Sequence, residues 1–568
     1  MVSPKFQKVS SDQLSVSGQT KKLFQAIYFL KQQNEAKPED ISRIRVSALI
    51  SKVAFFYEKI RNAVDYDEEH LLRKNAIERI LKRQIVIEGV LKASKSEEIS
   101  LHLITELIRA GYLPNNEIPE AKIKEIGQLL EKYIKLKSFC LDKISTFSDA
   151  ETDTKIVKNK IKERSGLVSW LISLAATEIE ENLGYNNVQR TIVQNMYDDL
   201  EKNIQAQDKL QEIYKKDLKI QIYLSIFRKH LKYNDSMLSL ILFRYYNSTW
   251  TKNNISDEEI YEIAYNIKTL QAAIARQLNH PLIKQIDNIT KKYSVFYQIL
   301  TETIGDKPVK LYNEVRTNAK VYYQKIKETY SQKYKRMKKS LWRSALRSII
   351  YIFLTKSIFV ILIEVPAIRW FNEEINYLAL FINITFPALL LFIMVLLTRK
   401  PSTKNLEAVV EGVQEVTYNE HKRTRPFFIA PPAKRRPVVN FVYNLIYTTT
   451  FLFTAYLFIR VLLAINFNWV SITIFLFFLA FVSFFSIRVK KNVKELIIAE
   501  RKDNLADFLF DFFYMPIVAT GRWLSDKASK VNIFIFILDF VIEAPFKVFV
   551  EIAEDWTKYV KERKEDIM

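Results

Sequence analysis

The sequence predicts an all-α membrane protein, in which a large N-terminal helical domain precedes a four-helix transmembrane region and C-terminal amphipathic helices. Three observations support this prediction. Glycine occurs only nine times among 568 residues, far below its usual share of about 7%, so the chain has little of the glycine-dependent turn chemistry that sheets use. Four apolar segments in the last part of the chain each have about the ~20 residues that a helix needs to cross a bilayer. The loops beside them alternate between strongly basic and nearly free of Lys and Arg.

The N-terminal region is expected to be cytoplasmic and helical. Residues 1–20 are rich in Ser, Gln and Lys and predict a disordered tail. Residues 21–147 and 155–340 are expected to form two subdomains, because apolar residues such as Ile77 and Leu81 recur at helical steps. The short polar stretch at residues 148–154 is the expected boundary, and Ser256 with Glu259 has the spacing of a capping box. Such a large helical surface predicts a protein partner.

A basic juxtamembrane helix is predicted from Val315 onward, leading into the first span. Its apolar stripe predicts packing on another helix or, alternatively, an element that transmits the position of the cytoplasmic region to the membrane. The stripe consists of Tyr323, Ile326, Tyr330, Tyr334 and Met337. Basic residues here and in the loop between the second and third spans are expected to face anionic lipid headgroups. They are Lys335, Arg336, Lys338, Lys339, Lys434, Arg435 and Arg436.

The transmembrane region is predicted at residues 346–397 for the first two helices and 441–487 for the last two. The intervening loop, residues 398–440, is basic and contains several prolines, so it is either a linker that sets topology or a segment that binds lipid or a partner. Because Lys and Arg accumulate on the cytoplasmic side of membranes, both termini and this loop are expected to be cytoplasmic. The expected location is the cell inner membrane.

Three charged residues lie away from the ends of the predicted spans, where charges are costly and mark functional candidates: Lys356, Glu364 and Arg460. Glu364 and Arg460 are expected at similar depth, because their helices run in opposite directions, and so predict an ion pair. One hypothesis is that this pair holds the helices together while the Lys356 side chain extends toward the cytoplasmic side. The other is a polar pathway through the bundle, for which Thr450, Thr454 and Tyr456 also supply hydroxyl groups.

Residues 488–568 are expected to form cytoplasmic helices at the membrane interface and a charged tail. Two hydrophobic stretches there, residues 505–524 and 531–542, are too polar or too short to span comfortably. They contain an acid cluster of Asp507, Asp511, Asp539 and Glu543. Acid pairs on helices bind divalent metals in sites that also use His, and no His lies nearby. We therefore expect no metal site.

Motifs for catalysis are absent from the sequence. The chain has no GxxxxGK[ST], GxGxxG, GxSxG, HExxH or CxxC, so no catalytic residue and no cofactor is predicted. The net charge of +22 suits nucleic acid or anionic lipid, and lipid is favoured because the basic residues cluster beside the apolar segments. The single cysteine, Cys140, excludes an intramolecular disulfide. Formation of a homo-oligomer remains a possibility.

Two stretches of sequence carry a family resemblance. They are residues 57–83 (YEKIRNAVDYDEEHLLRKNAIERILKR) and residues 516–568, with GRWLSDKASK, LDFVIEAPFK and DWTKYVKERKEDI. Both resemble membrane proteins of reduced-genome bacteria that form a family without an assigned activity, and the resemblance extends over most of the chain. It implies a bacterial inner-membrane setting and transfers no residue role.

The expected function is a non-enzymatic scaffold or regulator at the cytoplasmic face of the membrane. One alternative is a transporter or channel component that uses Lys356, Glu364 and Arg460. A second alternative is a membrane-bound, lipid-modifying enzyme that uses the acid cluster.

Overall fold

The structure is a computed structural model of the chain, and it confirms the all-α prediction. It describes residues 14–35, 42–62, 68–87, 96–145, 154–184, 186–252, 254–305, 307–398, 401–419, 423, 425–431, 437–499 and 505–530, and a few single positions after residue 551. Within these residues the only strands are two of three residues each. The chain divides into two compact units, which are treated separately. The helical unit contains Gly18–Thr290 and Thr424–Ala430, and the span unit contains Lys291–Arg423, Pro431–Ile533 and the residues before Gly18.

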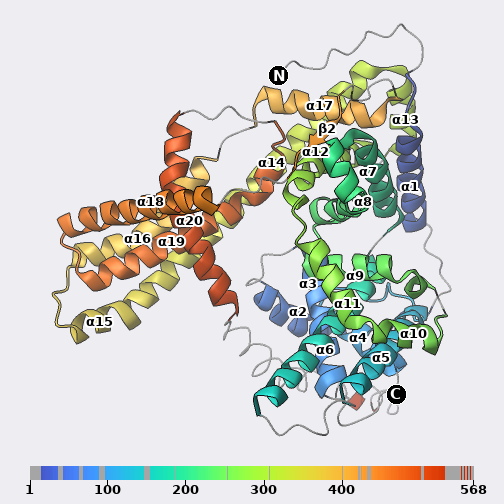
Figure 1. Cartoon of the computed structure of the whole chain (residues 1–568), viewed down its shortest axis with the longest axis horizontal. Helices are drawn as coiled ribbons and strands as arrows, with labels where there is room; N and C mark the ends of the chain where they lie inside the picture. The colour runs from blue at the N-terminus through green and yellow to red at the C-terminus, as the bar shows by residue number, and fades with distance from the viewer. Residues whose placement is uncertain are drawn as a thin grey trace. The chain divides into compact units, whose positions relative to one another are not determined.

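The helical unit is built around α6 (Thr154–Gly184), which packs against α3, α5 and α9 (Figure 1). Its other elements are α1 (Gly18–Glu35), α2 (Ala48–Asn62), α3 (Glu69–Lys82), η1 (Arg83–Ile87), α4 (Ser96–Arg109), α5 (Ala121–Ser145), α7 (Asn187–Asn203), β1 (Ile204–Ala206), α8 (Asp208–Lys229), α9 (Asp235–Tyr246), η3 (Ser248–Thr251), α10 (Asp257–Tyr265), α11 (Ile267–Leu278), the start of α12 (Ile283–Ile304) and β2 (Phe427–Ile429).

Two buried glutamates of α6 in this unit pair with arginines of neighbouring helices. Arg73 of α3 donates to Glu180 of α6 over 2.6 Å, and Arg244 of α9 donates to Glu181 over 2.5 Å. Burial raises the pKa of both glutamates, although the arginines oppose that shift. A side chain at Gly184 would place its Cβ 2.5 Å from the Arg73 guanidinium, so the glycine leaves room for the pair.

The predicted subdomain boundary at residues 148–154 stays a prediction, because residues 148–153 lie outside the described residues. Helices α5 and α6, on either side of that stretch, pack against each other. The division between the two compact units falls inside α12, between Thr290 and Lys291. The capping box of Ser256 and Glu259 is confirmed at the start of α10.

The predicted disordered tail of residues 1–20 is too long, because the structure already contains ordered residues from position 14 onward. Residues 1–13 lie outside the described residues, but Val16 forms an antiparallel bridge with Tyr418 and the Ser17 hydroxyl donates to the Val416 carbonyl. Helix α1 then begins at Gly18.

Within its described residues, the span unit contains four helices that are long and apolar enough to cross a membrane: Ala319–Trp370, Tyr377–Leu396, Pro437–Ala464 and Trp469–Lys491. They include the four predicted spans. The elements of the unit are the end of α12, α13 (Pro308–Thr317), α14 (Ala319–Phe359), the π-helical turn η4 (Val360–Glu364), α15 (Val365–Trp370), α16 (Tyr377–Leu396), α17 (Thr403–Thr417), α18 (Pro437–Ala464), α19 (Trp469–Glu495) and α20 (Leu505–Lys530).

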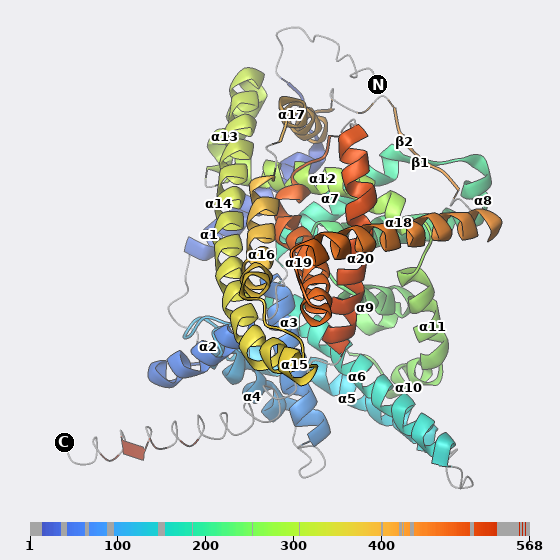
Figure 2. The same cartoon turned by 90° about the vertical axis from the view of Figure 1, so that its left-hand side faces the viewer.

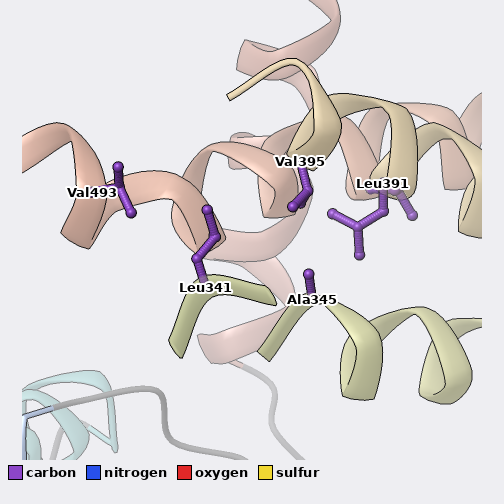
Figure 3. Packing of buried hydrophobic residues seen from close by; sticks show 6 residues of the cluster. Leu341, Ala345, Leu391, Val395 and Val493 are labelled. Carbon is purple, nitrogen blue, oxygen red and sulfur yellow. The ribbon is translucent and has the colours of Figure 1, made fainter. Parts of the chain in front are cut away.

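Three of these helices, α14, α16 and α19, form a packed bundle. Figure 3 shows Leu341 and Ala345 of α14 facing Leu391 and Val395 of α16, with Val493 of α19 beside them. Helix α18 is different, because in Figure 2 it runs across the view while α16 is seen nearly end-on. Most of its apolar side chains are exposed. This third candidate span therefore presents a long apolar surface outside the bundle.

The juxtamembrane helix begins later than predicted. Asn318 interrupts the chain after α13, and its side chain accepts hydrogen bonds from the backbone N–H groups of Lys320 and Val321, which starts α14 at Ala319. The buried stripe contains Tyr322 rather than Tyr323, followed by Ile326 and Tyr330 as predicted. Steps of four residues place Tyr322 on the face of Ile326 and Tyr330.

The loop between the second and third spans is more than a linker. Its helix α17 buries Val409 and Val413 completely. A Cβ at Gly412 would lie 2.1 Å from the ring of Phe296 on α12, so the two helices approach closely there. The Tyr418 hydroxyl donates to the Val315 carbonyl over 2.9 Å. Packing therefore fixes this part of the loop within the span unit.

Asn405 of α17 joins three parts of the span unit. Its amide donates to the Tyr330 hydroxyl on α14 and to the Leu496 carbonyl, and its carbonyl accepts from the backbone N–H groups of Ile498 and Ala499. All four hydrogen-bonding positions of this buried side chain are used. The start of α17 is thereby tied to α14 and to the chain after α19.

The helix predicted at residues 505–524 is present as α20, which packs closely on α19, and its position at the membrane interface stays a prediction. A Cβ at Gly521 would lie 1.9 Å from the Ala480 carbonyl oxygen and 2.9 Å from Cβ of Phe484. Small residues at such crossings allow helix backbones to approach. Helix α20 is not among the four candidate spans, and residues 531–542 lie outside the described residues.

We expect Gly521→Ala to destabilise the protein by about 1–3 kcal/mol, because the added methyl group forces α19 and α20 apart. Gly166→Ala is the matched control, since a Cβ at this glycine of α6 meets nothing within 4 Å. That control should be neutral or stabilising by up to about 1 kcal/mol. Thermal unfolding in nanodiscs measures both, and equal melting temperatures would contradict the close packing.

Glu78 gives a pH-dependent prediction. Burial alone would raise its pKa, but Lys74 and Lys82 outweigh burial and hold the pKa below its ordinary value. A carboxyl group whose pKa is lowered by folding stabilises the folded state at pH values above its unfolded-state pKa. This stabilisation is lost as the pH falls from the unfolded-state pKa through the folded-state pKa. Glu78→Gln should therefore lower the free energy of unfolding at neutral pH. On acidification, the variant should lose less of this free energy than the wild type loses.

The measurement is the difference in unfolding free energy between wild type and Glu78→Gln across an acid titration. Glu131→Gln is the control, because this side chain is 55% exposed beside Lys135 and exposed pairs contribute little. A pH-independent difference for Glu78→Gln would refute the assignment.

Candidate intramembrane site

The most unusual feature of the span unit is a buried pair of opposite charges in its apolar bundle. The Lys356 Nζ lies 3.7 Å from Oε2 of Glu364, and neither side chain is exposed at all. Lys356 belongs to α14, and Glu364 ends the π-helical turn that follows. A charge isolated in hydrocarbon is costly, so each residue gives the other the partner that makes its burial tolerable.

The π-helical turn explains why these two residues meet. Eight residues of regular α-helix advance by about 12 Å and end about 80° away from the starting face. The wider turn η4 contains an extra residue, which rotates Glu364 back toward the face of Lys356. Pro366 lies two residues after Glu364, and because proline lacks an N–H and crowds the preceding turn, it disfavours a regular α-helix at this place.

Glu364 also binds side chains from two other helices. Its Oε1 accepts hydrogen bonds from the Asn383 amide of α16 over 2.6 Å and from the Ser471 hydroxyl of α19 over 2.7 Å. Asn383 is fully buried and Ser471 nearly so. One carboxylate thus connects all three helices of the packed bundle.

The Lys356 ammonium has an aromatic partner as well. It lies 3.9 Å from the ring centroid of Phe478 on α19 and 5.3 Å from that of Phe359. A cation over a ring face is stabilised by the negative face of the π system, most strongly where water is excluded. The Lys356 side chain is therefore held within the bundle by Glu364 and the two rings. The first hypothesis, in which this side chain extends toward the cytoplasmic side, is wrong on this point.

The predicted ion pair of Glu364 with Arg460 is wrong. Arg460 of α18 is exposed, whereas Glu364 is completely buried and directed to Lys356, Asn383 and Ser471. Equal depth in a membrane does not bring two residues together when one helix lies outside the bundle, as α18 does. Sequence spacing predicted the depth but not the rotation of α18.

Hydroxyl groups of α18 do not join this network. Thr450 and Thr454 are buried, but they donate to the Ile446 and Thr450 carbonyls of their own helix. Sequence reasoning missed Asn383 and Ser471. The available signal for Asn383 was an amide in the middle of an otherwise apolar segment, since such groups in membranes find a partner in a neighbouring helix.

The basic residues predicted to face lipid are only partly described. Lys335, Arg336 and Lys339 of α14 are exposed and Lys338 is half-buried, and Arg336 forms an ion pair with Glu302 of α12 over 2.9 Å. Lys434, Arg435 and Arg436 lie outside the described residues.

The acid cluster is described at one position. Asp511 of α20 is exposed, whereas the side chain of Asp507 and the whole of Asp539 and Glu543 lie outside the described residues. Within the described part of the chain, no group of three or more His, Cys, Asp or Glu residues could hold a metal ion.

Comparison of the chain with known protein families, curated proteins and solved structures finds no match. The roles of these residues therefore rest on geometry and chemistry alone.

A double-mutant cycle tests the pair. Lys356→Met and Glu364→Gln each leave one group without its partner, and breaking a buried pair costs about 3–5 kcal/mol. The double variant should be clearly more stable than the sum of the two losses predicts, because it leaves no unpaired charge. Unfolding in nanodiscs measures the cycle. Arg460→Met is the control and should change stability little, and additive losses for Lys356 and Glu364 would refute coupling between them.

Proposed function

We propose that this protein is a non-enzymatic scaffold or regulator of the bacterial inner membrane, with both termini and the helical unit in the cytoplasm. The observation that carries the proposal is the complete burial of the Lys356 and Glu364 pair, with donors to Glu364 from two further helices. Contacts that join three packed helices in this way favour a fixed anchor over a path for solutes, because a passing solute must first break them.

The cytoplasmic helical surface supplies the binding part of the proposed scaffold. Tyr245 on α9 and Tyr261 and Tyr265 on α10 are each more than half exposed. Tyrosine is enriched where proteins bind partners, because its ring is apolar and its hydroxyl remains hydrated. The partner of the scaffold is therefore a protein that covers aromatic side chains of the helical unit.

The membrane anchor adds electrostatic attraction to the proposed role. Exposed Lys335, Arg336 and Lys339 lie on α14 before the apolar part of that helix, and each basic residue near an anionic surface contributes about 1 kcal/mol. The family resemblance to membrane proteins of reduced-genome bacteria fits this setting.

A transporter or channel component is the second candidate, and one observation favours it. In the described part of the chain, Oδ1 of Asn383 and Oε2 of Glu364 are buried without a hydrogen-bond donor. Buried acceptors of this kind also occur where an ion or proton is bound in transit. On this alternative Lys356 and Glu364 line the path, while the third residue predicted for it, Arg460, is exposed outside the bundle.

Crosslinking and mass spectrometry on protein extracted gently from its native membrane tests the scaffold. We expect a reproducible protein partner crosslinked to residues 18–290. Variants with Tyr261 and Tyr265 both changed to Ser should lose that partner, and a variant with exposed Arg460→Ser should keep it. Recovery of a partner-free homo-oligomer would contradict the scaffold.

An exchange of the two charges separates the candidates. Lys356→Glu combined with Glu364→Lys retains an ion pair, so a scaffold should keep its partner. A transport path should instead change its conductance for H⁺, Na⁺ or K⁺ in proteoliposomes. A change in conductance with an unchanged partner yield would favour transport.

A further inference from the structure

The loop between α16 and α18 leaves the span unit and contributes a strand to the helical unit. Residues 424–430 belong to the helical unit, although the chain on both sides of them belongs to the span unit. Strand β2 pairs in parallel with β1, with Ile204 opposite Phe427, Gln205 opposite Phe428 and Ala206 opposite Ile429. This pairing joins residues that are more than 200 positions apart in the sequence.

Side chains of the helical unit hold the end of this strand. The Gln285 amide of α12 donates to the Ala430 carbonyl over 2.9 Å and accepts from the Ala430 N–H over 3.1 Å. The Gln207 N–H donates to the Ile429 carbonyl over 3.4 Å. Ile429 is completely buried, whereas Phe428 is 68% exposed. The strand is thus recognised through its backbone and through one aliphatic side chain.

This arrangement has the features of peptide binding by strand addition, in which backbone hydrogen bonds provide affinity and alternate side chains provide specificity. Two paired strands of three residues are not stable by themselves in water. The burial of Ile429 and the hydrogen bonds of Gln285 must therefore supply the additional stability that the short pairing needs. Pro426 and Pro431 bracket the segment, keep the preceding residues extended and limit the pairing to a few residues.

We propose that the helical unit contains a binding groove for extended peptides, formed by β1, Gln207 and Gln285, and that the chain fills it with its own residues 427–430. Its ligand is an extended segment with an aliphatic residue at the position of Ile429 and a small residue after it. The chain's own segment is an internal competitor, and displacing it opens the groove to a second peptide. This inference is independent of the proposed scaffold function.

The test measures binding of a fluorescent peptide of residues 423–431, RTRPFFIAP, to the full-length protein in nanodiscs. Ile429→Asp in the protein should displace the internal segment, since a charge cannot occupy its buried position. We expect this variant to bind the peptide on the order of tenfold more tightly than the wild type, whose groove is filled. Phe428→Ala is the matched control, and it should bind as weakly as the wild type because this side chain is exposed.

Two further arms complete the experiment. A peptide with Ile429→Asp should not bind any variant. A protein with residues 427–430 replaced by Gly-Ser-Gly-Ser should bind the original peptide as well as Ile429→Asp does, and it serves if Ile429→Asp fails to fold. Absence of peptide binding by a folded variant with an emptied groove would overturn the proposal. Absence of any crosslinked partner of the wild type, together with peptide binding by the variant with an emptied groove, would count against the scaffold alone.

Discussion

The cost of placing charge in an apolar bundle is the constraint on which the span unit depends. Lys356 and Glu364 tolerate complete burial because each neutralises the other, and because Asn383, Ser471 and Phe478 supply further contacts. The partners come from α16 and α19, so the positions of these helices are linked to the charge on α14. Helix α18 takes no part in this network, and it is also the candidate span with the least packed surface.

A second constraint acts where the bundle meets the rest of the span unit. Asn405 uses all its hydrogen-bonding positions to connect α17 with α14 and with the chain after α19. Because α14 continues from this junction to Lys356 without a break, the junction and the intramembrane pair lie on one helix. The positions of the junction and of the pair are therefore linked through a single helix.

The loop between the second and third spans contributes more to the packing of the protein than its basic, proline-containing composition indicates. Its helix α17 packs into the span unit, and its strand β2 belongs to the helical unit. The same loop therefore contributes to both compact units. Pro426 and Pro431 limit the length of the paired segment. The apolar side chains of the loop that are completely buried include Val409, Val413 and Ile429. These contacts are the ones that a competing peptide would have to replace.

The sequence by itself determined the all-α class, the four apolar spans, the capping box at Ser256 and the candidacy of Lys356 and Glu364. Each of these depends on composition, on length or on spacing within one segment, which can be counted along the chain. Tertiary structure alone decided that Glu364 pairs with Lys356 rather than Arg460, that Asn383 and Ser471 join them, and that α5 and α6 belong to one unit. These outcomes depend on how each helix is rotated and on which helices pack together. Such choices are set by the summed contacts of residues far apart in sequence, and no local pattern records them.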